Sequence, residues 1–131
     1  MEKYQKDFDR WNVVKKNINA KNRKVFFYEK EIWWMNIGVN VGSEQDGKGD
    51  LFMRPVFIYK KINGTTFVGI PLTTVNREDS MHVSFYFEYE INTAIISQIS
   101  VFDRKRLMNR MGGVSDYLFL KIKKAVVAFV S

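Results

Sequence analysis

The region from residue 25 to residue 101 limits the possible folds most, because it consists of short segments rich in β-branched and aromatic residues. Asn63-Gly64 stands between two of these segments, and this dipeptide favours a tight hairpin turn. It predicts that a strand at 54–59 pairs antiparallel with a strand at 66–70. Further strands are predicted at 25–28 with 31–37, at 81–89 and at 94–101. Short strands joined by hairpins, with helices only at the chain ends, indicate a small antiparallel barrel or a strongly curled sheet.

Residues 3–18 carry an apolar side chain at every third or fourth position, which is the spacing of one face of an amphipathic helix. This apolar stripe consists of Phe8, Trp11, Val14 and Ile18. The polar segment 19–24 is predicted to be a linker. We therefore divide the chain into a helix with its linker, residues 1–24, and a β domain, residues 25–131. Because water is a poor environment for an apolar stripe, the helix is expected to dock on the β domain of its own chain.

The sequence predicts two helices after the last strand. Asp103 can cap the first, over 104–111, and Gly112-Gly113 would end it. Ser115 can cap the second. The apolar stripe of that second helix consists of Leu118, Ile122, Ala125 and Phe129.

Missing and rare residue types exclude several classes of protein. The chain has no cysteine, which excludes disulfides, thiolate nucleophiles and zinc sites built on cysteine. Its single histidine, His82, excludes a pair of histidines as metal ligands or as acid and base, and a structural role is expected for it. The sequence contains no run of 18 apolar residues and begins with a charged segment, so neither a membrane span nor a secretory signal is expected. We expect a cytoplasmic protein with no metal and no cofactor.

The formal net charge is +7, and the positive charge lies in the two flanks of the chain. Residues 1–30 contain nine basic and four acidic residues, and residues 104–131 contain seven basic and one acidic residue. The middle, 31–103, is acidic, with five basic and nine acidic residues. A basic protein attracts polyanions such as nucleic acid, but lysines and arginines also serve simply to solvate the outer faces of helices. Charge alone leaves both interpretations open.

Four groups of residues could carry chemistry. A glycine-rich loop at 42–49 permits close approach of a ligand, although it lacks the spacing of a phosphate-binding P-loop. Arg54 offers a rigid fork of donors to a phosphate, and the hydroxyls of Thr73 and Thr74 can donate to phosphate oxygens. His82 is the fourth. Taken alone, each of them is better explained as an ordinary loop, a surface arginine, a turn residue or a structural histidine.

Taken together and in order, these segments resemble the MazF/PemK family of toxin endoribonucleases. The motifs are Glu31-Ile32-Trp33-Trp34, Gly42-Ser43-Glu44-Gln45-Asp46-Gly47, Arg54-Pro55-Val56 and Ile70-Pro71-Leu72-Thr73-Thr74. The stretch 96–107 is similar to the family's last core strand and the helix after it, so the resemblance covers about 28–112. It implies a mainly β fold, an SH3-like barrel of the CcdB/PemK/MazF type, with an N-terminal helical extension and C-terminal helices. It also implies a homodimer and a cognate antitoxin with an acidic tail, with which the toxin binds DNA.

Residue by residue, the resemblance puts the catalytic arginine at Arg54, the catalytic threonine at Thr73 and the conserved loop glutamate at Glu44. Gln98 matches a glutamine of structural role. RNA carries its own nucleophile, the 2′-hydroxyl, so a metal ion is not required. Arg54 would stabilise the charge of the phosphorane, Thr73 would donate to a non-bridging oxygen, and Glu44 would orient Arg54 or accept the 2′-hydroxyl proton.

Further residues are candidates for binding single-stranded RNA. The positive charges are Lys48, Lys60, Lys61 and Arg77, and the aromatic rings that could stack on bases are Phe52 and Tyr59. Trp33 and Trp34 are expected to belong to the core rather than to the RNA surface.

Two classes of function follow. In the first, the protein cuts single-stranded RNA and leaves a 2′,3′-cyclic phosphate and a 5′-hydroxyl. In the second, it is a binding protein on the same barrel, either a gyrase inhibitor similar to CcdB or a degenerate toxin that only binds its antitoxin. The sequence favours the first, because Arg54 and Thr73 both lie in their motifs.

Overall fold

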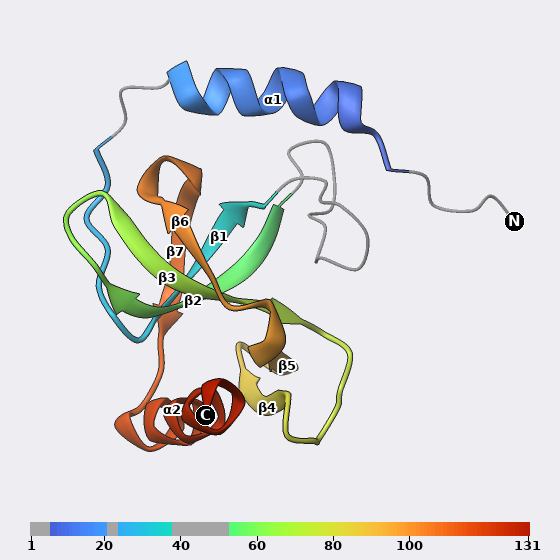
Figure 1. Ribbon diagram of the computed structural model, residues 1–131, viewed down its shortest axis with the longest axis vertical. Helices are drawn as coiled ribbons and strands as arrows, with labels where there is room; N and C mark the ends of the chain where they lie inside the picture. Colours follow the sequence, from blue (N-terminus) through green and yellow to red (C-terminus); the bar gives the residue numbers. More distant parts are fainter. Residues whose placement is uncertain (1–5, 21–23, 38–52) are drawn as a thin grey trace, which may run out of the picture.

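The computed structural model describes residues 6–20, 24–37 and 53–131. The strands are β1 (Glu31–Asn36), β2 (Met53–Lys61), β3 (Thr66–Thr73), β4 (His82–Phe87), β5 (Glu90–Ile95), β6 (Ser100–Asp103) and β7 (Leu107–Gly113). Two α-helices, α1 (Phe8–Ala20) and α2 (Asp116–Val130), lie at opposite ends of the sheet (Figure 1). Two short 3-10 helices, η1 (Ile96–Gln98) and η2 (Arg104–Arg106), precede β6 and β7.

The seven strands form one antiparallel sheet in the order β4-β5-β3-β2-β1-β7, and β6 pairs with β3 outside this order. The first half of β3 pairs with β6 through Thr66–Gly69, whereas its end pairs with β5 through Leu72 and Thr73. Because β3 pairs with both β6 and β5 along the same edge, the sheet curls strongly around β3 (Figure 1). The predicted mainly β, curled fold with terminal helices is confirmed.

The predicted Asn63-Gly64 hairpin connects β2 to β3. Asn63 Oδ1 accepts hydrogen bonds from the backbone N and the Oγ1 of Thr65, both at 2.9 Å. The backbone N of Ile62 donates to the carbonyl O of Thr66 at 3.0 Å and closes the turn. Next to the turn Lys61 pairs with Phe67, and after a shift of the register between Ile58 and Lys60, Ile58 pairs with Gly69 and Val56 with Pro71.

Alternating side chains of the central strands fill two separate cores. On one face, Ile32, Phe57 and Ile70 pack with Ile122 and Val126 of α2. On the other face, Trp33 and Met35 of β1 pack with residues of β2, β3 and β7, and Phe27 joins them from the segment before β1. Residues 25–28, predicted as a strand, have no strand structure. They are apolar because Phe27 is fully buried, not because they pair in the sheet.

The prediction of a single strand at 94–101 is wrong. The strand β5 begins at Glu90 and pairs with β4, the chain then makes η1, and β6 pairs with β3 instead. The backbone N of Ile96 donates to the carbonyl O of Met81 at 2.9 Å where the chain changes partner. Ala94, Ile95 and Ile96 are all buried, so the run of apolar residues continues from β5 into η1. The sequence pattern therefore does not reveal where the strand ends.

The predicted helix over 104–111 is also wrong. Asp103 does act as a cap, and its carboxylate accepts from the backbone N of Lys105 at 2.8 Å, but it caps only the single turn η2. The chain then forms β7, in which Gly112 and Gly113 pair with β1 rather than ending a helix. Pairing with the free edge of β1 outweighs the helical preference of the Arg, Leu and Met residues in this segment.

The two terminal helices dock on different parts of the sheet. Ser115 caps α2 as predicted, with its Oγ accepting from the backbone N of Leu118 at 3.2 Å. Ile122 of its predicted apolar stripe is buried, whereas Phe129 in the last turn is 37% exposed. The prediction that α1 docks on its own β domain is confirmed, because Trp11 and Ile18 are buried and the Arg106 guanidinium of η2 lies 5.7 Å from the centre of the Trp11 ring. No helix in the described ranges is long and apolar enough to cross a membrane.

Candidate functional site

A cavity of about 730 Å³ lies where β2 begins and β3 ends, and we call it the Arg54 cavity. Its polar lining comes from four places: Arg54 on β2, Thr73 and Thr74 at the end of β3, the β4–β5 hairpin, and Asn109 on β7. Trp34 of β1 and Phe87 of β4 add aromatic surface. The cavity therefore combines a cation, hydroxyls and flat rings, which is a combination suited to a nucleotide.

The hairpin register brings Arg54 and Thr73 to the same end of the sheet. Val56 pairs with Pro71, and Arg54 and Thr73 each stand two residues further toward this end. Arg54 also pairs with Met35 of β1, and Thr73 pairs with Thr93 of β5, so both residues lie on inner strands held from both sides. The Oγ1 of Thr73 accepts from the backbone N of Val75 at 3.3 Å, which leaves its hydroxyl hydrogen to donate to a ligand.

A second part of the cavity wall carries acceptors. Glu88, Glu90 and Asn92 line it, all from the β4–β5 hairpin. Glu88 and Tyr89 form the turn and both have positive φ, 49° and 65°, as a tight I′-type turn requires. Asn92, which is 4% exposed, donates from Nδ2 to the carbonyl oxygens of Phe87 at 3.2 Å and Glu90 at 3.3 Å, and it fixes the turn.

Sequence reasoning missed this wall. The strand predicted at 81–89 is too long, because β4 ends at Phe87 and Tyr89 is 92% exposed. Neither turn residue is Gly, Asn or Asp, so the usual signal of a hairpin is absent. The two glutamates in an otherwise apolar and aromatic segment are the one signal that pointed to a turn.

The adjacent tryptophans have different environments. Trp33 is buried in a core as predicted, and its Nε1 donates to Oε1 of Glu31 at 3.1 Å. Trp34 was predicted to be a core residue as well, but it is only partly buried and lines the Arg54 cavity. Successive side chains of a strand point to opposite faces of the sheet, which explains why Trp33 lies in the core and Trp34 lines the cavity.

The described residues that were predicted to bind RNA are not among those that line this cavity: Lys60, Lys61, Arg77 and Tyr59. Lys60 and Lys61 stand at the other end of β2, about 20 Å from Arg54 along an extended strand. Lys61 Nζ lies 4.8 Å and 4.7 Å from the ring centres of Phe27 and Tyr28.

Tyr59 packs on Phe119 with ring centres 5.9 Å apart, and burial raises the pKa of its hydroxyl. Glu44, Lys48 and Phe52 lie outside the described residues, and their roles stay predictions.

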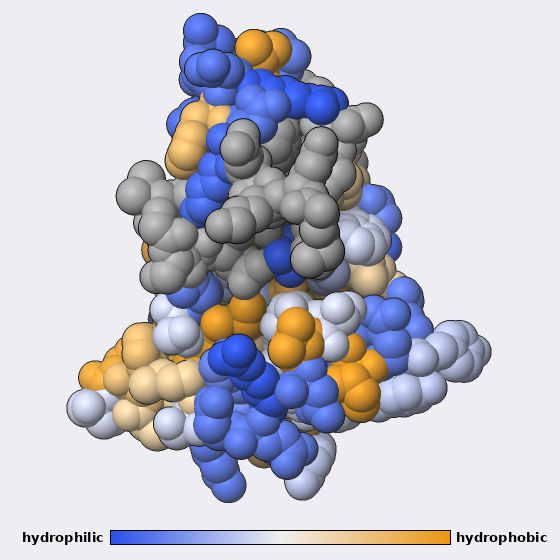
Figure 2. All heavy atoms as spheres, turned by 90° about the vertical axis from the view of Figure 1, so that its right-hand side faces the viewer, coloured by the Kyte–Doolittle hydropathy of each residue, from blue (hydrophilic) through white to orange (hydrophobic). Residues whose placement is uncertain are grey.

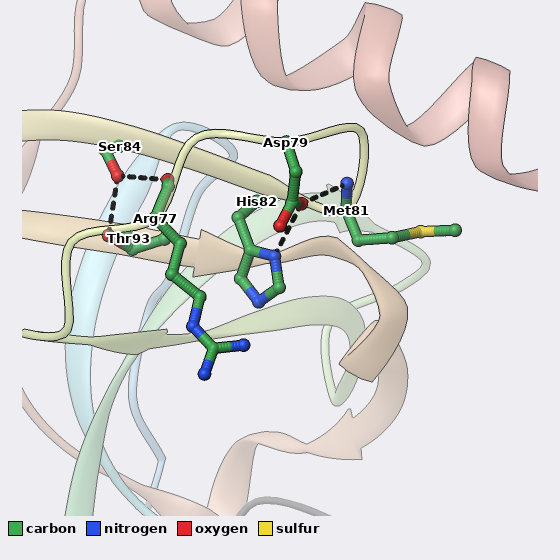
Figure 3. Close-up of polar contacts among 6 residues, drawn as sticks. All are labelled: Arg77, Asp79, Met81, His82, Ser84 and Thr93. Carbon is green, nitrogen blue, oxygen red and sulfur yellow. Dashed lines mark hydrogen bonds and ion pairs between the residues drawn. The ribbon is translucent and has the colours of Figure 1, made fainter.

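The loop between β3 and β4 is held by polar contacts next to the cavity (Figure 3). Ser84 Oγ donates to the carbonyl O of Arg77 at 2.7 Å and lies 2.8 Å from Oγ1 of Thr93, the residue that pairs with Thr73. The Arg77 side chain itself points away from these contacts (Figure 3). The contacts thus connect the loop to the strand that carries Thr93.

His82 makes another of the contacts that hold the β3–β4 loop. Its Nδ1 lies 2.7 Å from Oδ1 of Asp79, which also accepts from the backbone N of Met81 at 2.8 Å (Figure 3). The hydrogen bond from His82, then that from Met81, holds the pKa of the Asp79 carboxyl below its usual value. This pairing supports a structural role for His82. Within 6–20, 24–37 and 53–131, no group of three or more His, Asp or Glu residues could hold a metal ion.

Comparisons with known proteins identify the family. The sequence model of the PemK-like, MazF-like toxins of type II toxin-antitoxin systems matches residues 28–130. No curated protein matches the sequence. Among solved structures, the chain is similar to an endoribonuclease in complex with its cognate antitoxin from a mycobacterial species, with 16% identity, a TM-score of 0.62, and 79% of this chain and 94% of that one covered.

Two structures from Deinococcus radiodurans give the same result. The first is MazF, with 14% identity and a TM-score of 0.66, covering 81% of this chain and 97% of the other. The second is a MazE-MazF complex, with 14% identity and a TM-score of 0.59, covering 81% and 96%. At these identities the structures establish a shared fold, and the sequence model covers most of the chain. The chain therefore belongs to the PemK-like, MazF-like toxins of type II toxin-antitoxin systems.

Proposed function

We propose that this protein is an endoribonuclease that cuts single-stranded RNA in the cytoplasm and thereby stops translation and growth. The observation that carries the proposal is that Arg54 and Thr73 line one cavity at the junction of β2 and β3. The cavity offers a cation and hydroxyl donors that could bind a phosphate. It also offers aromatic surface on which the bases of the attached nucleosides could stack. The similarity to the mycobacterial endoribonuclease and to MazF of Deinococcus radiodurans supports the same activity.

The proposed reaction needs no metal ion, because the 2′-hydroxyl of the substrate attacks the adjacent phosphorus. The bond from phosphorus to the 5′-oxygen then breaks, and the products are a 2′,3′-cyclic phosphate and a 5′-hydroxyl. The Arg54 guanidinium stabilises the extra negative charge of the phosphorane, which is the largest single effect in such reactions. It remains protonated near pH 7, so it can also give a proton to the leaving 5′-oxygen.

Thr73 donates its hydroxyl hydrogen to a non-bridging phosphate oxygen in this proposal. Its Oγ1 is fixed by accepting from the backbone N of Val75, so the hydrogen has a preferred direction. Glu44 is proposed to orient Arg54 or to accept the proton of the 2′-hydroxyl. RNA outside the cavity would meet the more distant candidates Lys60, Lys61 and Arg77.

We further propose that the toxin is a homodimer and binds an acidic antitoxin. The outer face of α2 exposes Tyr117, Leu120, Val127 and Val130, an apolar surface that a second copy of the chain could cover. A second cavity, of about 400 Å³, lies between α1 and η2 and is lined by Lys15, Lys16, Lys105 and Arg106 beside Asp103. This basic surface would attract an acidic antitoxin tail.

The test is incubation of the purified protein with cellular RNA in EDTA. We expect discrete fragments whose 5′-hydroxyl ends accept a phosphate label from polynucleotide kinase without prior phosphatase treatment. The variant Arg54→Ala should give no fragments, whereas the control Arg10→Ala, which removes an exposed arginine of α1 outside the cavity, should cut normally. Intact RNA together with undiminished antitoxin binding would overturn the proposal and favour a protein that only binds. Inhibition of gyrase by the same sample would favour the CcdB-like function.

A further inference from the structure

We propose that the β4–β5 hairpin is the base-reading element of the Arg54 cavity and that it selects guanine beside the cleaved phosphate. This inference rests on the proposed endoribonuclease function, and it assigns a role to residues that the catalytic proposal does not use. The two walls of the cavity differ in chemistry, since Arg54, Thr73 and Thr74 offer donors whereas Glu88, Glu90 and Asn92 offer acceptors. A nucleotide has the matching asymmetry, with a phosphate that accepts and a base that donates.

Asn92 gives the strongest indication that the second wall faces a ligand. The residue is 4% exposed, and both hydrogen bonds of its side-chain amide use Nδ2, which donates to the carbonyl oxygens of Phe87 and Glu90. Because these two acceptors fix the orientation of the amide, the other atom must be Oδ1, an acceptor. Among the residues that the structure describes, none donates a hydrogen bond to this Oδ1, although Asn92 lines the cavity. An acceptor that lines a cavity and receives no hydrogen bond from the described residues is a position for a ligand N–H group.

The hairpin is held in a conformation that its sequence does not favour. Glu88 and Tyr89 both have positive φ, which glycine or asparagine adopts far more readily. Strained backbone of this kind persists where surrounding contacts hold it, and it is concentrated at functional sites. Here the Asn92 amide provides the holding contacts on both sides of the turn. The result is that Glu88 and Glu90, on either side of Tyr89, both line the cavity.

Aromatic surface for a base is fixed in the same place. Phe87 lies so close to Gly112 of β7 that a Cβ atom on this glycine would stand 2.9 Å from Cζ of the Phe87 ring. Gly112 therefore lets the ring pack directly on the backbone of β7 beside the cavity. Trp34 lines the cavity from β1. A base entering the cavity would find aromatic side chains to contact and carboxylates to receive its N–H groups.

The chemistry of the acceptors favours guanine over the other bases. Guanine presents N1–H and N2–H₂ side by side, and the two oxygens of one carboxylate can accept both. Adenine and cytosine present an amino group next to an unprotonated ring nitrogen, which a carboxylate would repel. Uracil presents a single N–H between two carbonyl oxygens. A wall of carboxylates and an amide oxygen therefore discriminates against all three.

The experiment compares oligoribonucleotides that differ only at the base. Cut ends from a random-sequence RNA pool are sequenced, and the guanine at the preferred position is then replaced by inosine, which lacks the N2 amino group. For the wild-type protein we expect the replacement to lower kcat/KM by at least about tenfold. In Glu88→Gln and Glu90→Gln, at least one variant should lose most of this difference. The matched control Glu78→Gln, in the β3–β4 loop outside the cavity lining, should keep it.

The outcomes separate this inference from the proposed function. Cleavage without a guanine preference next to the cut, or a guanine preference that survives in both glutamine variants, would overturn the role of the hairpin and leave the endoribonuclease intact. If no RNA is cut at all, equilibrium binding of the guanine and inosine oligonucleotides still decides the base-reading role. Equal affinity for the two oligonucleotides would then overturn it, and a preference for guanine that is lost in Glu88→Gln or Glu90→Gln would support it.

Discussion

At the scale of single residues, the Arg54 cavity separates groups that differ in how they interact with a phosphate. Arg54 carries a permanent charge, whereas Thr73 contributes one neutral donor. A charged donor aimed at developing negative charge stabilises a transition state more than a neutral donor does. The two residues should therefore contribute unequally to the rate, although both line the same cavity.

Substitution of these two residues tests the order of their effects. We expect Arg54→Ala to lower the cleavage rate by about 10²–10³, which is the usual cost of losing a preorganised donor. Thr73→Val, which keeps the shape of the side chain, should cost less, because the charge of Arg54 remains. Single-turnover cleavage of one oligoribonucleotide measures both rates, and circular dichroism checks that each variant is folded. A folded Arg54→Ala protein that cuts at the wild-type rate would contradict the mechanism.

The Asp79–His82 pair predicts how stability depends on pH. The pKa of Asp79 is lower in the folded protein than its ordinary value of 3.8, chiefly because of the hydrogen bond with His82. A carboxyl with a lowered pKa stabilises the folded state above its ordinary pKa, and this contribution is lost as the pH falls through the folded-state pKa. The wild type should thus melt at a higher temperature than Asp79→Asn at pH 6, and the difference should shrink below about pH 4. A difference that stays constant down to pH 2 would show that the charge of Asp79 is irrelevant.

At the scale of secondary-structure elements, the sequence predicts what depends on local pattern. The strands β1, β2 and β3 were located because turn residues bound them and the Asn63-Gly64 hairpin pairs two of them. The strand β7 was mistaken for a helix because its identity depends on pairing with β1, a partner 70 or more residues away. Arg54 and Thr73 were identified from their motifs, whereas Glu88 and Asn92 become part of the cavity only through the register of β4 and β5. No local pattern encodes such a register.

The helix α1 is an element whose contribution can be removed as a unit. Its buried side chains, Trp11 and Ile18, lie against η2 rather than among the residues that line the Arg54 cavity. A protein that lacks residues 1–24 should therefore be less stable, because burying such side chains contributes about 1.5–3 kcal/mol each. The bases at which it cuts should not change. Thermal denaturation and sequencing of cut ends measure the two properties, and an unchanged melting temperature with much faster cleavage would instead identify α1 as an inhibitory arm.

At the scale of the whole molecule, the two halves present different surfaces. Figure 2 shows mostly hydrophilic residues at the α1 end, and apolar groups among hydrophilic ones in the half that contains α2 and the β4–β5 hairpin. The exposed apolar side chains of α2, Tyr117, Leu120, Val127 and Val130, belong to this second half. Exposed apolar surface of this kind is typical of sites where a second chain binds.

Substitutions on α2 test the proposed homodimer. Leu120 and Val127 are 54% and 51% exposed, so replacing them with glutamate should not disturb the fold of one subunit. We expect the wild type to be a dimer by light scattering at micromolar concentration and Leu120→Glu/Val127→Glu to be a monomer. Lys121→Glu changes charge at an exposed position of the same helix, outside the stripe that Leu120 and Val127 form, and serves as the control. A wild type that is monomeric and fully active would refute the dimer.

The position of β3 inside the sheet has a consequence for motion and for how specificity could change. Every residue of β3 pairs with a neighbouring strand, and Phe67, Val68 and Gly69 pair on both sides, whereas β4 is the last strand of the sheet and, among the described strands, pairs with β5 alone. We expect amide hydrogen exchange, followed by NMR or mass spectrometry, to be slowest in β3 and much faster in β4. Thr73 would thus stay fixed while the hairpin that carries Glu88 opens often. Such a toxin could acquire a new cleavage motif by altering its edge hairpin, with no change in the strand that carries the catalytic threonine.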